Sequence, residues 1–499
     1  MRGAFKAGLR GRRVRAGISA VVFCGLVAGA CGDDVDKAIS ETPAERAAGG
    51  WHTWVLTSPA DIAVPAPPAK DSAKAKADLD EVKRLAKDRP PAITEAINKW
   101  SGPLPVEPWM AQIFEYVSKR EKNPPLSSRN YALVSVAMSD AAVAAYHWKY
   151  QYNVEPPSGV ERAIPASADP SYPSEHAAIA GAASKVLAYL YPDESALRLD
   201  EMADNAGLSR VQAGTNTPSD VEAGLALGRA VAEKVIAYGK ADGSDAVWNG
   251  RRPTGIGTGS AFWNPPPGSV SPPIAPAAAN WKTFTLTSNN QFRSPPPPAY
   301  NSAAFRTSAQ SLIDIKKNLT DDQKRIAKFW EGAEGTSLPA GIVNEVYFAD
   351  LREAATASDP AKRASIPWLA RAVAMINVAM SDGGVSVWEA KYFYWYPRPE
   401  NAIRDTGLDR AWTPHLPTPR FPAYPSGSAG YAGAAEAVMA YLIPEKAAEF
   451  KRRAEEQAVS RQYGGIHWDF DAVSIDGGRS IGQLVIDKVK ADTSASGRA

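Results

Sequence analysis

Apolar residues return every three or four positions over two long regions of the chain, from about residue 95 to 240 and again after residue 310. The spacing is clearest at 131–146 and 177–190, and a helix presents such positions on one face. Thr320 and Gln323 form a capping box that predicts a helix start at DDQKRIAKFW. Alternating apolar and polar positions, which are typical of β-strands, are scarce. The pattern therefore predicts an all-α fold.

A weak internal repeat indicates how these helices are organised. Three short blocks occur twice in the same order: VAMSD at 136–140 and 378–382, YPS at 172–174 and 424–426, and SR at 209–210 and 460–461. An apolar helical pattern also follows each copy of the second block. We therefore expect two pseudo-symmetric four-helix-type bundles packed about a pseudo-twofold axis.

Proline content and composition set the expected boundaries between segments. The 499 residues include 41 prolines, with runs at 265–267 and 295–298, and a stretch rich in Ala, Pro, Lys and Asp precedes the first helical region. The expected segments are a signal peptide at 1–30, a tether at 32–95, a first bundle at 96–245, a Pro-rich linker at 246–310 and a second bundle at 311–491.

The first 30 residues have the pattern of a secretory signal. Residues 1–15 carry six Arg and Lys and no acidic residue, and the apolar run at 18–30 is too short to span a bilayer. The sequence Ala-Gly-Ala-Cys at 28–31 resembles a bacterial lipoprotein cleavage site, which implies that Cys31 is the first mature residue and is acylated. We expect an extracytoplasmic protein of the bacterial cell envelope, held at the membrane only by this lipid anchor. Plain secretion is the alternative.

Net charge and cysteine content exclude several classes of function. The formal net charge is +2, whereas a general nucleic-acid-binding protein carries a strong basic excess, so we expect no nucleic-acid partner. The two cysteines, Cys24 and Cys31, lie near the N-terminus, so the folded part has neither a disulfide nor a Cys-based zinc site. The chain also lacks the dinucleotide, Walker and HExxH motifs.

The second copy of the repeat carries residues that together suit an oxyanion. Lys391, Arg398 and Arg461 supply three cationic groups, and arginine adds planar bidentate donors for the oxygens of a tetrahedral anion. Ser426 offers a hydroxyl, and Gly427 lets a backbone amide approach closely at the start of an apolar helix, whose positive dipole end favours an anion. We expect these five residues to bind one multiply charged anion.

His467 and Asp471 add chemistry that the cations cannot supply. A neutral imidazole nitrogen can attack phosphorus covalently or coordinate a metal oxyanion axially. Asp471 follows His467 by one helical turn and is expected to hold the other ring nitrogen and so fix the tautomer. We therefore expect His467 to contact the central atom of the anion.

The arrangement K-x6-RP, PSG and SR-x3-G-x-H-x3-D resembles the signature of the vanadium haloperoxidase and type 2 phosphatidic acid phosphatase superfamily. The segments KYFYWYPRPENAIR and FPAYPSGSAGYAGAAEAV are similar to its bacterial haloperoxidase-related branch. The resemblance implies two four-helix bundles with the active site in the C-terminal one. It implies that vanadate, or phosphate as a competing ligand, is bound by Lys391, Arg398, Ser426, Gly427 and Arg461. It also implies that His467 is the axial vanadium ligand, or the phosphorylated nucleophile of a phosphatase.

Ser428 departs from the family pattern, which has histidine after Pro-Ser-Gly. In the phosphatases that histidine is the general acid, a role worth about 10²–10⁴-fold, and serine is a poor substitute. In the haloperoxidases it hydrogen-bonds vanadate, which a hydroxyl can partly do, while Lys391 polarises the bound peroxide. We therefore expect a vanadate-dependent haloperoxidase that oxidises halide with hydrogen peroxide and halogenates a small organic acceptor. The alternatives are an acid phosphatase with a phosphohistidine at His467, and a non-catalytic phosphate-binding lipoprotein.

The first copy of the repeat is expected to be degenerate and inactive. Pro156 stands where the second copy has Arg398, and Asn216 stands where it has His467. His415, in the loop WTPHLPTPRFP, is a candidate for the missing proton donor at the pocket mouth. Candidates for lining the entrance are Trp395, Tyr396, Trp412 and Phe421.

Overall fold

The computed structural model describes residues 46–165, 167–193, 196–266, 268, 272–359 and 363–492. Within these ranges the regular elements are helices and no strand occurs, so the predicted all-α fold is confirmed. The expected signal peptide and Cys31 lie outside the described residues and stay predictions. No described helix is both long enough and apolar enough to cross a membrane.

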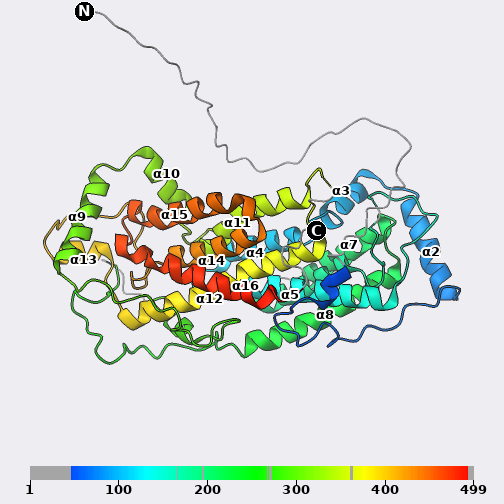
Figure 1. Ribbon diagram of the computed structural model, residues 1–499, viewed down its shortest axis with the longest axis horizontal. Helices are drawn as coiled ribbons and strands as arrows, with labels where there is room; N and C mark the ends of the chain where they lie inside the picture. Colours follow the sequence, from blue (N-terminus) through cyan, green and yellow to red (C-terminus); the bar gives the residue numbers. More distant parts are fainter. Residues whose placement is uncertain are drawn as a thin grey trace, which may run out of the picture. The chain divides into compact units, whose positions relative to one another are not determined.

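Two helical bundles form the body of the protein, as the repeat predicts. The first consists of α4 (Glu107–Arg120), α5 (Pro124–Tyr152), α6 (Glu175–Leu190), α7 (Ala196–Gln212) and α8 (Pro218–Lys240). The second consists of α11 (Leu338–Ala355), α12 (Ile366–Tyr394), α14 (Gly427–Leu442), α15 (Ala447–Tyr463) and α16 (Ser474–Val489). Helices α5 and α12 pack against each other and join the bundles (Figure 1).

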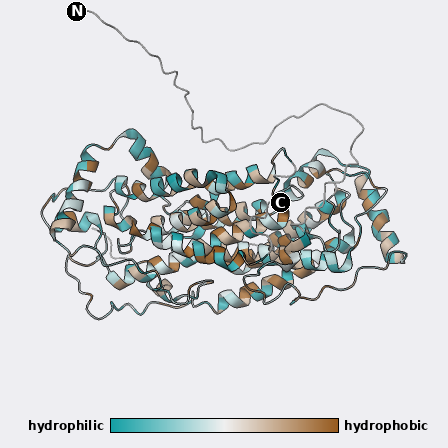
Figure 2. Ribbon diagram, in the orientation of Figure 1, coloured by the Kyte–Doolittle hydropathy of each residue, from teal (hydrophilic) through white to brown (hydrophobic). Residues whose placement is uncertain are grey.

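Small residues let the helices within each bundle approach closely. A Cβ on Gly228 of α8 would lie 2.0 Å from the carbonyl oxygen of Ala178 in α6, and a Cβ on Gly433 of α14 would lie 2.0 Å from that of Ile475 in α16. Glycine is therefore required at both crossings, because any side chain would force the helices apart. The helices also differ in hydropathy: α14 is hydrophobic, and α15, which packs against it, is largely hydrophilic (Figure 2).

The repeat begins further toward the N-terminus of each half than its three blocks indicate. The sequence WHTWVLTS at 51–58 returns as WKTFTLTS at 281–288. Each of these segments starts an extended stretch, which we name the first strap (residues 51–72) and the second strap (residues 281–302). Each strap ends at a serine whose side chain caps a helix, Ser72 for α2 (Ala73–Ala86) and Ser302 for α9 (Ala303–Lys317).

The aspartate of each VAMSD block anchors the strap of its own half. Asp140 accepts hydrogen bonds from the backbone amides of Trp54, Val55 and Leu56 at 2.9, 2.9 and 3.1 Å. Asp382 accepts them from Phe284 and Thr285 at 2.9 and 2.7 Å. Both aspartates are fully buried, so these bonds satisfy carboxylates that water cannot reach.

The expectation of a tether at 32–95 is wrong for its described part, residues 46–95. This part contains the 3-10 helix η1 (Ala48–Gly50), the first strap, α2 and the start of α3 (Pro91–Trp100), and its Trp51, Leu56 and Val82 are buried in the main core. The expected linker at 246–310 likewise packs against the second bundle, with Trp263 and Trp281 buried. Backbone hydrogen bonds and a few large buried side chains hold these segments in place. An Ala- and Pro-rich composition does not indicate either kind of contact.

The remaining short elements complete the second half. They are the 3-10 helix η2 (Pro276–Asn280), α10 (Asp321–Phe329), which begins at the predicted capping box, α13 (Pro399–Asp405), and the 3-10 helices η4 (Pro444–Lys446) and η5 (Asp469–Val473). Helix α10 packs on α15 as α3 packs on α7 in the first half. Each half is therefore a strap, two short helices and a bundle in the same order.

Candidate active site

Residues far apart in the sequence meet at one end of the second bundle. Lys391 lies in the last turn of α12, Arg398 caps the start of α13, and Arg461 lies in the last turn of α15. His467 and Asp471 lie between α15 and α16, Asp471 within η5. All five side chains are buried, with Lys391 and Arg398 at 0% exposure and His467 at 4%. We name these five residues the His467 cluster.

Local backbone structure explains how the cluster is assembled. Trp395, in the left-handed region with φ 52°, ends α12 and turns the chain toward Arg398. Gly465, with φ 72°, turns the chain after α15 so that His467 follows, and a Cβ there would lie 3.0 Å from Pro414. The backbone amide of Ser426 donates to the carbonyl of Asp471 at 2.8 Å, which ties the start of α14 to the cluster.

The ring of His467 is held at both nitrogens. Nδ1 lies 2.6 Å from Asp471 Oδ2, and Nε2 lies 3.1 Å from Arg398 Nη1. Because a guanidinium only donates, Nε2 is the acceptor, and the ring proton therefore lies on Nδ1 and is donated to Asp471. Nε2 therefore stays unprotonated, and its lone pair accepts the hydrogen bond from Arg398.

Lys391 and Arg398 lie side by side beneath the ring of Phe421. Lys391 Nζ donates to the carbonyls of Pro422 and Ala423, each at 2.8 Å. Arg398 donates through Nε to the carbonyl of Phe421 at 2.8 Å. The Phe421 ring centre lies 5.1 Å from Lys391 Nζ and 4.8 Å from Arg398 Cζ, within the range of cation–π attraction. Phe421 thus covers two cations, a more specific position than the general entrance role predicted for it.

Arg461 reaches the cluster from the other side and is held by α10. Its Nη2 donates to the carbonyl of Ala327 at 2.8 Å and its Nη1 to that of Glu331 at 3.1 Å. Neither partner could be predicted from the sequence motifs, because a backbone carbonyl leaves no residue signature.

The cluster holds more positive than negative charge. No carboxylate among the described residues forms an ion pair with Lys391, Arg398 or Arg461, and their hydrogen bonds go to neutral acceptors. Burial lowers the pKa of Arg398 to about 9 and that of Arg461 to about 10, so both remain protonated at neutral pH. Burial and Arg398 also lower the pKa of Lys391 well below its usual value.

Burial is the main cause of two opposite pKa shifts, because it disfavours the charged form of both His467 and Asp471. Burial lowers the pKa of His467 well below its usual value, and the charges of Arg398, Lys391 and Arg461 lower it further. Burial raises the pKa of Asp471 to about 7, against the pull of Lys391 and Arg398. His467 is therefore neutral at physiological pH, the form in which Nε2 can act as a ligand or nucleophile.

A tetrahedral oxyanion fits the donors of the cluster. Arg398 Nη2 is buried and has no hydrogen-bond partner, and buried guanidinium N–H groups are normally satisfied. Ser426 and Gly427 begin α14, so the positive end of its dipole points to the same region. A Cβ on Gly427 would lie 3.2 Å from the Trp388 ring and 3.9 Å from Lys391 Cε, so glycine keeps this approach open.

Two other predicted residues have different surroundings. Ser428 lies directly after Gly427 in the first turn of α14 and is 8% exposed. His415 is joined to Gly464 through its backbone amide at 2.9 Å, and the charges that act on it come from Lys316 and from α10, not from the His467 cluster. The role of His415 as a proton donor stays a prediction.

Two family models match parts of the chain. Residues 371–449 match the VCPO second helical-bundle domain, and residues 130–241 match the PAP2 superfamily. The first match contains Lys391, Arg398 and the start of α14, and the second covers most of the first bundle. No curated protein matches the chain.

Solved structures are similar over most of the chain. A bacterial vanadium-dependent iodoperoxidase matches with a TM-score of 0.61 and 24% identity, covering 77% of this chain and 95% of its own. Holo and apo forms of a bacterial vanadium-dependent chloroperoxidase match with TM-scores of 0.55 and 0.56 at 18% identity, covering 76% and 75% of this chain and 96% and 95% of theirs. The chain has the vanadium haloperoxidase fold. The resemblance identified from the sequence motifs is confirmed.

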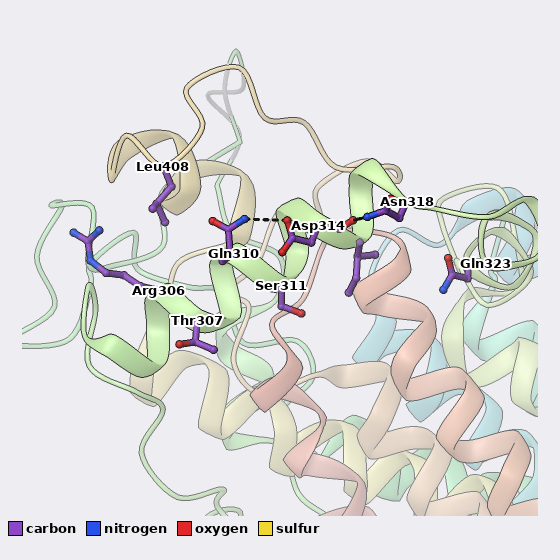
Figure 3. Close-up of a pocket in the computed structure, with 9 residues that line it drawn as sticks. Arg306, Thr307, Gln310, Ser311, Asp314, Asn318, Gln323 and Leu408 are labelled. Carbon is purple, nitrogen blue, oxygen red and sulfur yellow. Dashed lines mark hydrogen bonds between the residues drawn. The ribbon is translucent and has the colours of Figure 1, made fainter.

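One hollow on this vanadium haloperoxidase fold lies outside the His467 cluster. It is an open depression of about 820 Å³ lined by α9, the start of α10 and Leu408, and Figure 3 shows the hydrogen bond from Gln310 to Asp314 beside it. Another face of α9 packs against the cluster's surroundings through Phe305, whose ring centre lies 4.9 Å from that of Trp468. None of the cluster residues lines the depression.

Proposed function

We propose that this protein is a vanadate-dependent haloperoxidase that uses hydrogen peroxide to oxidise a halide for the halogenation of a small organic acceptor. The observation that carries the proposal is the composition of the His467 cluster. Two protonated arginines, a buried lysine and a neutral histidine with an unprotonated Nε2 meet in one place, and no carboxylate of the described residues forms an ion pair with the arginines or the lysine.

The charges of the cluster favour an anion with more than one negative charge. A buried cation without an opposite charge is costly, and an oxyanion among Lys391, Arg398 and Arg461 offsets that cost. The unpartnered Nη2 of Arg398 supplies a free donor, and guanidinium groups bind oxyanions through directed hydrogen bonds. Vanadate and phosphate share this charge and shape, so the cations alone do not distinguish between them.

His467 and Asp471 set the chemistry at the centre of the site. Asp471 holds the Nδ1 proton of His467 and so keeps the Nε2 lone pair directed away from the carboxylate. Vanadate, when bound, supplies a Lewis acid that activates hydrogen peroxide. The Nζ of Lys391 can donate a hydrogen bond to an oxygen of the bound anion and so polarise it. The ring of Phe421 covers Lys391 and Arg398 and shields both from water.

Ser428 favours the peroxidase over the phosphatase. Phosphate ester hydrolysis needs a proton donor for the leaving alkoxide, and a serine hydroxyl has no proton to give near neutral pH. Halide oxidation makes a smaller demand on this position, because the family residue there hydrogen-bonds vanadate and a hydroxyl can partly do the same. The similar solved structures, described as iodoperoxidase and chloroperoxidase, support the same choice.

The decisive test compares two reactions on purified protein. Vanadate-loaded protein is assayed for peroxide-dependent bromination of a phenol dye, and vanadate-free protein is assayed for hydrolysis of an aryl phosphate. We expect bromination in the wild type and its loss, by at least about 10²-fold, in His467→Ala. His147→Ala changes a histidine of the first bundle in the same way and should retain the activity.

Three outcomes distinguish the candidate functions. Bromination that depends on His467 supports the haloperoxidase. Hydrolysis without bromination would identify an acid phosphatase with a phosphohistidine at His467. Oxyanion binding without either reaction would identify a non-catalytic phosphate-binding protein.

A further inference from the structure

Besides Pro156 and Asn216, the two halves differ at the residue that follows the helix-capping serine of each anion site. Ser174 caps α6 as Ser426 caps α14, and each serine accepts a hydrogen bond from the amide three residues on at 3.4 Å. The next residue is Glu175 in the first half and Gly427 in the second. A carboxylate side chain therefore occupies the place that glycine leaves open in the His467 cluster.

Glu175 is paired with the lysine that corresponds to Lys391. Its Oε2 lies 2.8 Å from Lys149 Nζ, and both side chains are buried. Lys149 also donates to the carbonyls of Pro170 and Ser171, as Lys391 donates to those of Pro422 and Ala423. The two lysines thus have equivalent backbone partners, and only Lys149 has a carboxylate as well.

The other groups around Glu175 complete a charge-balanced pocket. Its Oε1 lies 2.8 Å from His176 Nδ1, and Arg210 Nε donates to Asn216 Oδ1 at 3.0 Å. Although burial opposes it, the pKa of Glu175 lies well below its usual value because Lys149, His176 and Arg210 favour the ionised form. Pro156 stands in place of the third cation. A small cavity of about 20 Å³, lined by Lys149, Glu175 and Arg210 among others, remains beside the carboxylate.

We propose that Glu175 is a built-in anion that fills a latent tetrahedral-oxyanion site in the first bundle. The inference rests on the proposed function, because it takes the His467 cluster as the oxyanion-binding counterpart. The carboxylate satisfies Lys149, which would otherwise be a buried cation without a negative partner. The first bundle therefore binds no oxyanion, and it would bind one once the carboxylate and its bulk were removed.

The first experiment opens the latent site. Binding of inorganic phosphate is measured by equilibrium dialysis for the wild type, Glu175→Gly and Glu175→Gln. We expect one phosphate per chain in the wild type, two in Glu175→Gly and one in Glu175→Gln, because glutamine still fills the space. Wild-type protein that binds none contradicts the proposed function. One phosphate in both the wild type and Glu175→Gly, or two in Glu175→Gln, overturns the present inference alone.

The reciprocal experiment closes the active site with the same side chain and does not depend on the folding of the first variant. Gly427→Glu should place a carboxylate beside Lys391 and abolish phosphate binding, although no cation is removed. Gly427→Ala is the matched control for the Cβ, which would press on the Trp388 ring at 3.2 Å. It should weaken phosphate binding but leave it measurable, because it adds neither a carboxylate nor the bulk of glutamate. Equal binding by Gly427→Glu and Gly427→Ala would overturn the inference.

Discussion

Lys391 and His467 share an environment in which a positive charge is expensive. Both are buried beside Arg398, and their pKa values are lowered mainly by burial and then by neighbouring cations. A bound dianion reverses part of this effect, because its negative charge favours the protonated form of each group. The charge state of the site is therefore coupled to its occupancy.

This coupling predicts that oxyanion binding takes up protons. Since burial and neighbouring cations lower the pKa values of Lys391 and His467 in the free protein and a bound anion raises them, affinity should fall as the pH increases through the range in which these groups lose their protons. Sulfate is the suitable probe, because it stays a dianion over this range and contributes no protons of its own. Calorimetry in two buffers with different ionisation enthalpies measures the uptake. Net proton release would contradict the assignment.

The two straps could not be predicted from hydrophobic periodicity, although their first eight residues are similar in sequence. Helical periodicity and the K-x6-RP, PSG and SR-x3-G-x-H-x3-D spacings predicted the bundles and the meeting of Lys391, Arg398 and His467. The same patterns could not predict the straps. Backbone amides of each strap donate to the side chain of Asp140 or Asp382, and the straps have no periodic spacing of apolar residues. These patterns also could not predict the carbonyl partners of Arg461, which are Ala327 on α10 and Glu331 just after that helix.

The second strap supports the active site through tyrosine hydroxyls. Tyr394 and Tyr396 donate to the carbonyls of Ser294 and Pro298 at 2.8 and 2.7 Å, and Tyr424 donates to that of Pro295. These tyrosines lie within a few residues of Lys391, Arg398 and Ser426. The first strap holds Tyr152 and Tyr172 in the same way, but beside the degenerate site.

Asp382→Ala and Asp140→Ala form a matched pair that separates stability from binding. Each leaves partly buried backbone amides without an acceptor, so each should lower the free energy of unfolding by about 2 kcal/mol, measured by urea denaturation. Only Asp382→Ala should also weaken phosphate binding, because only the second strap positions the His467 cluster. Equal losses of affinity in the two variants would show that the straps act through general stability.

At the scale of the whole molecule, the two bundles share one interior. The main hydrophobic cluster contains residues from both halves, and Tyr131 of α5 donates to the carbonyl of Ser337 at the start of α11 at 2.8 Å. The rings of Phe114 and Phe348 also meet across the halves, with centres 6.1 Å apart. Neither bundle can lose its packing without exposing the other.

Shared packing predicts that a ligand of the second bundle stabilises the first. Phosphate at about 100 times its dissociation constant adds about 2.7 kcal/mol to the stability of any unit that unfolds together with the site. Amide hydrogen exchange should therefore slow in α8 as well as in α16, and to a similar extent in the slowest-exchanging amides. Slower exchange in α16 alone would indicate that the two bundles unfold independently.

The packing of α5 on α12 has a consequence for the ancestry of the fold. These helices occupy equivalent places in the two halves, so the surface between them has the character of an isologous contact within one chain. A half-length protein with a single strap and bundle would leave that surface bare and would gain from pairing with its own duplicate. The repeat of strap and bundle within one chain is what duplication of such a half would produce.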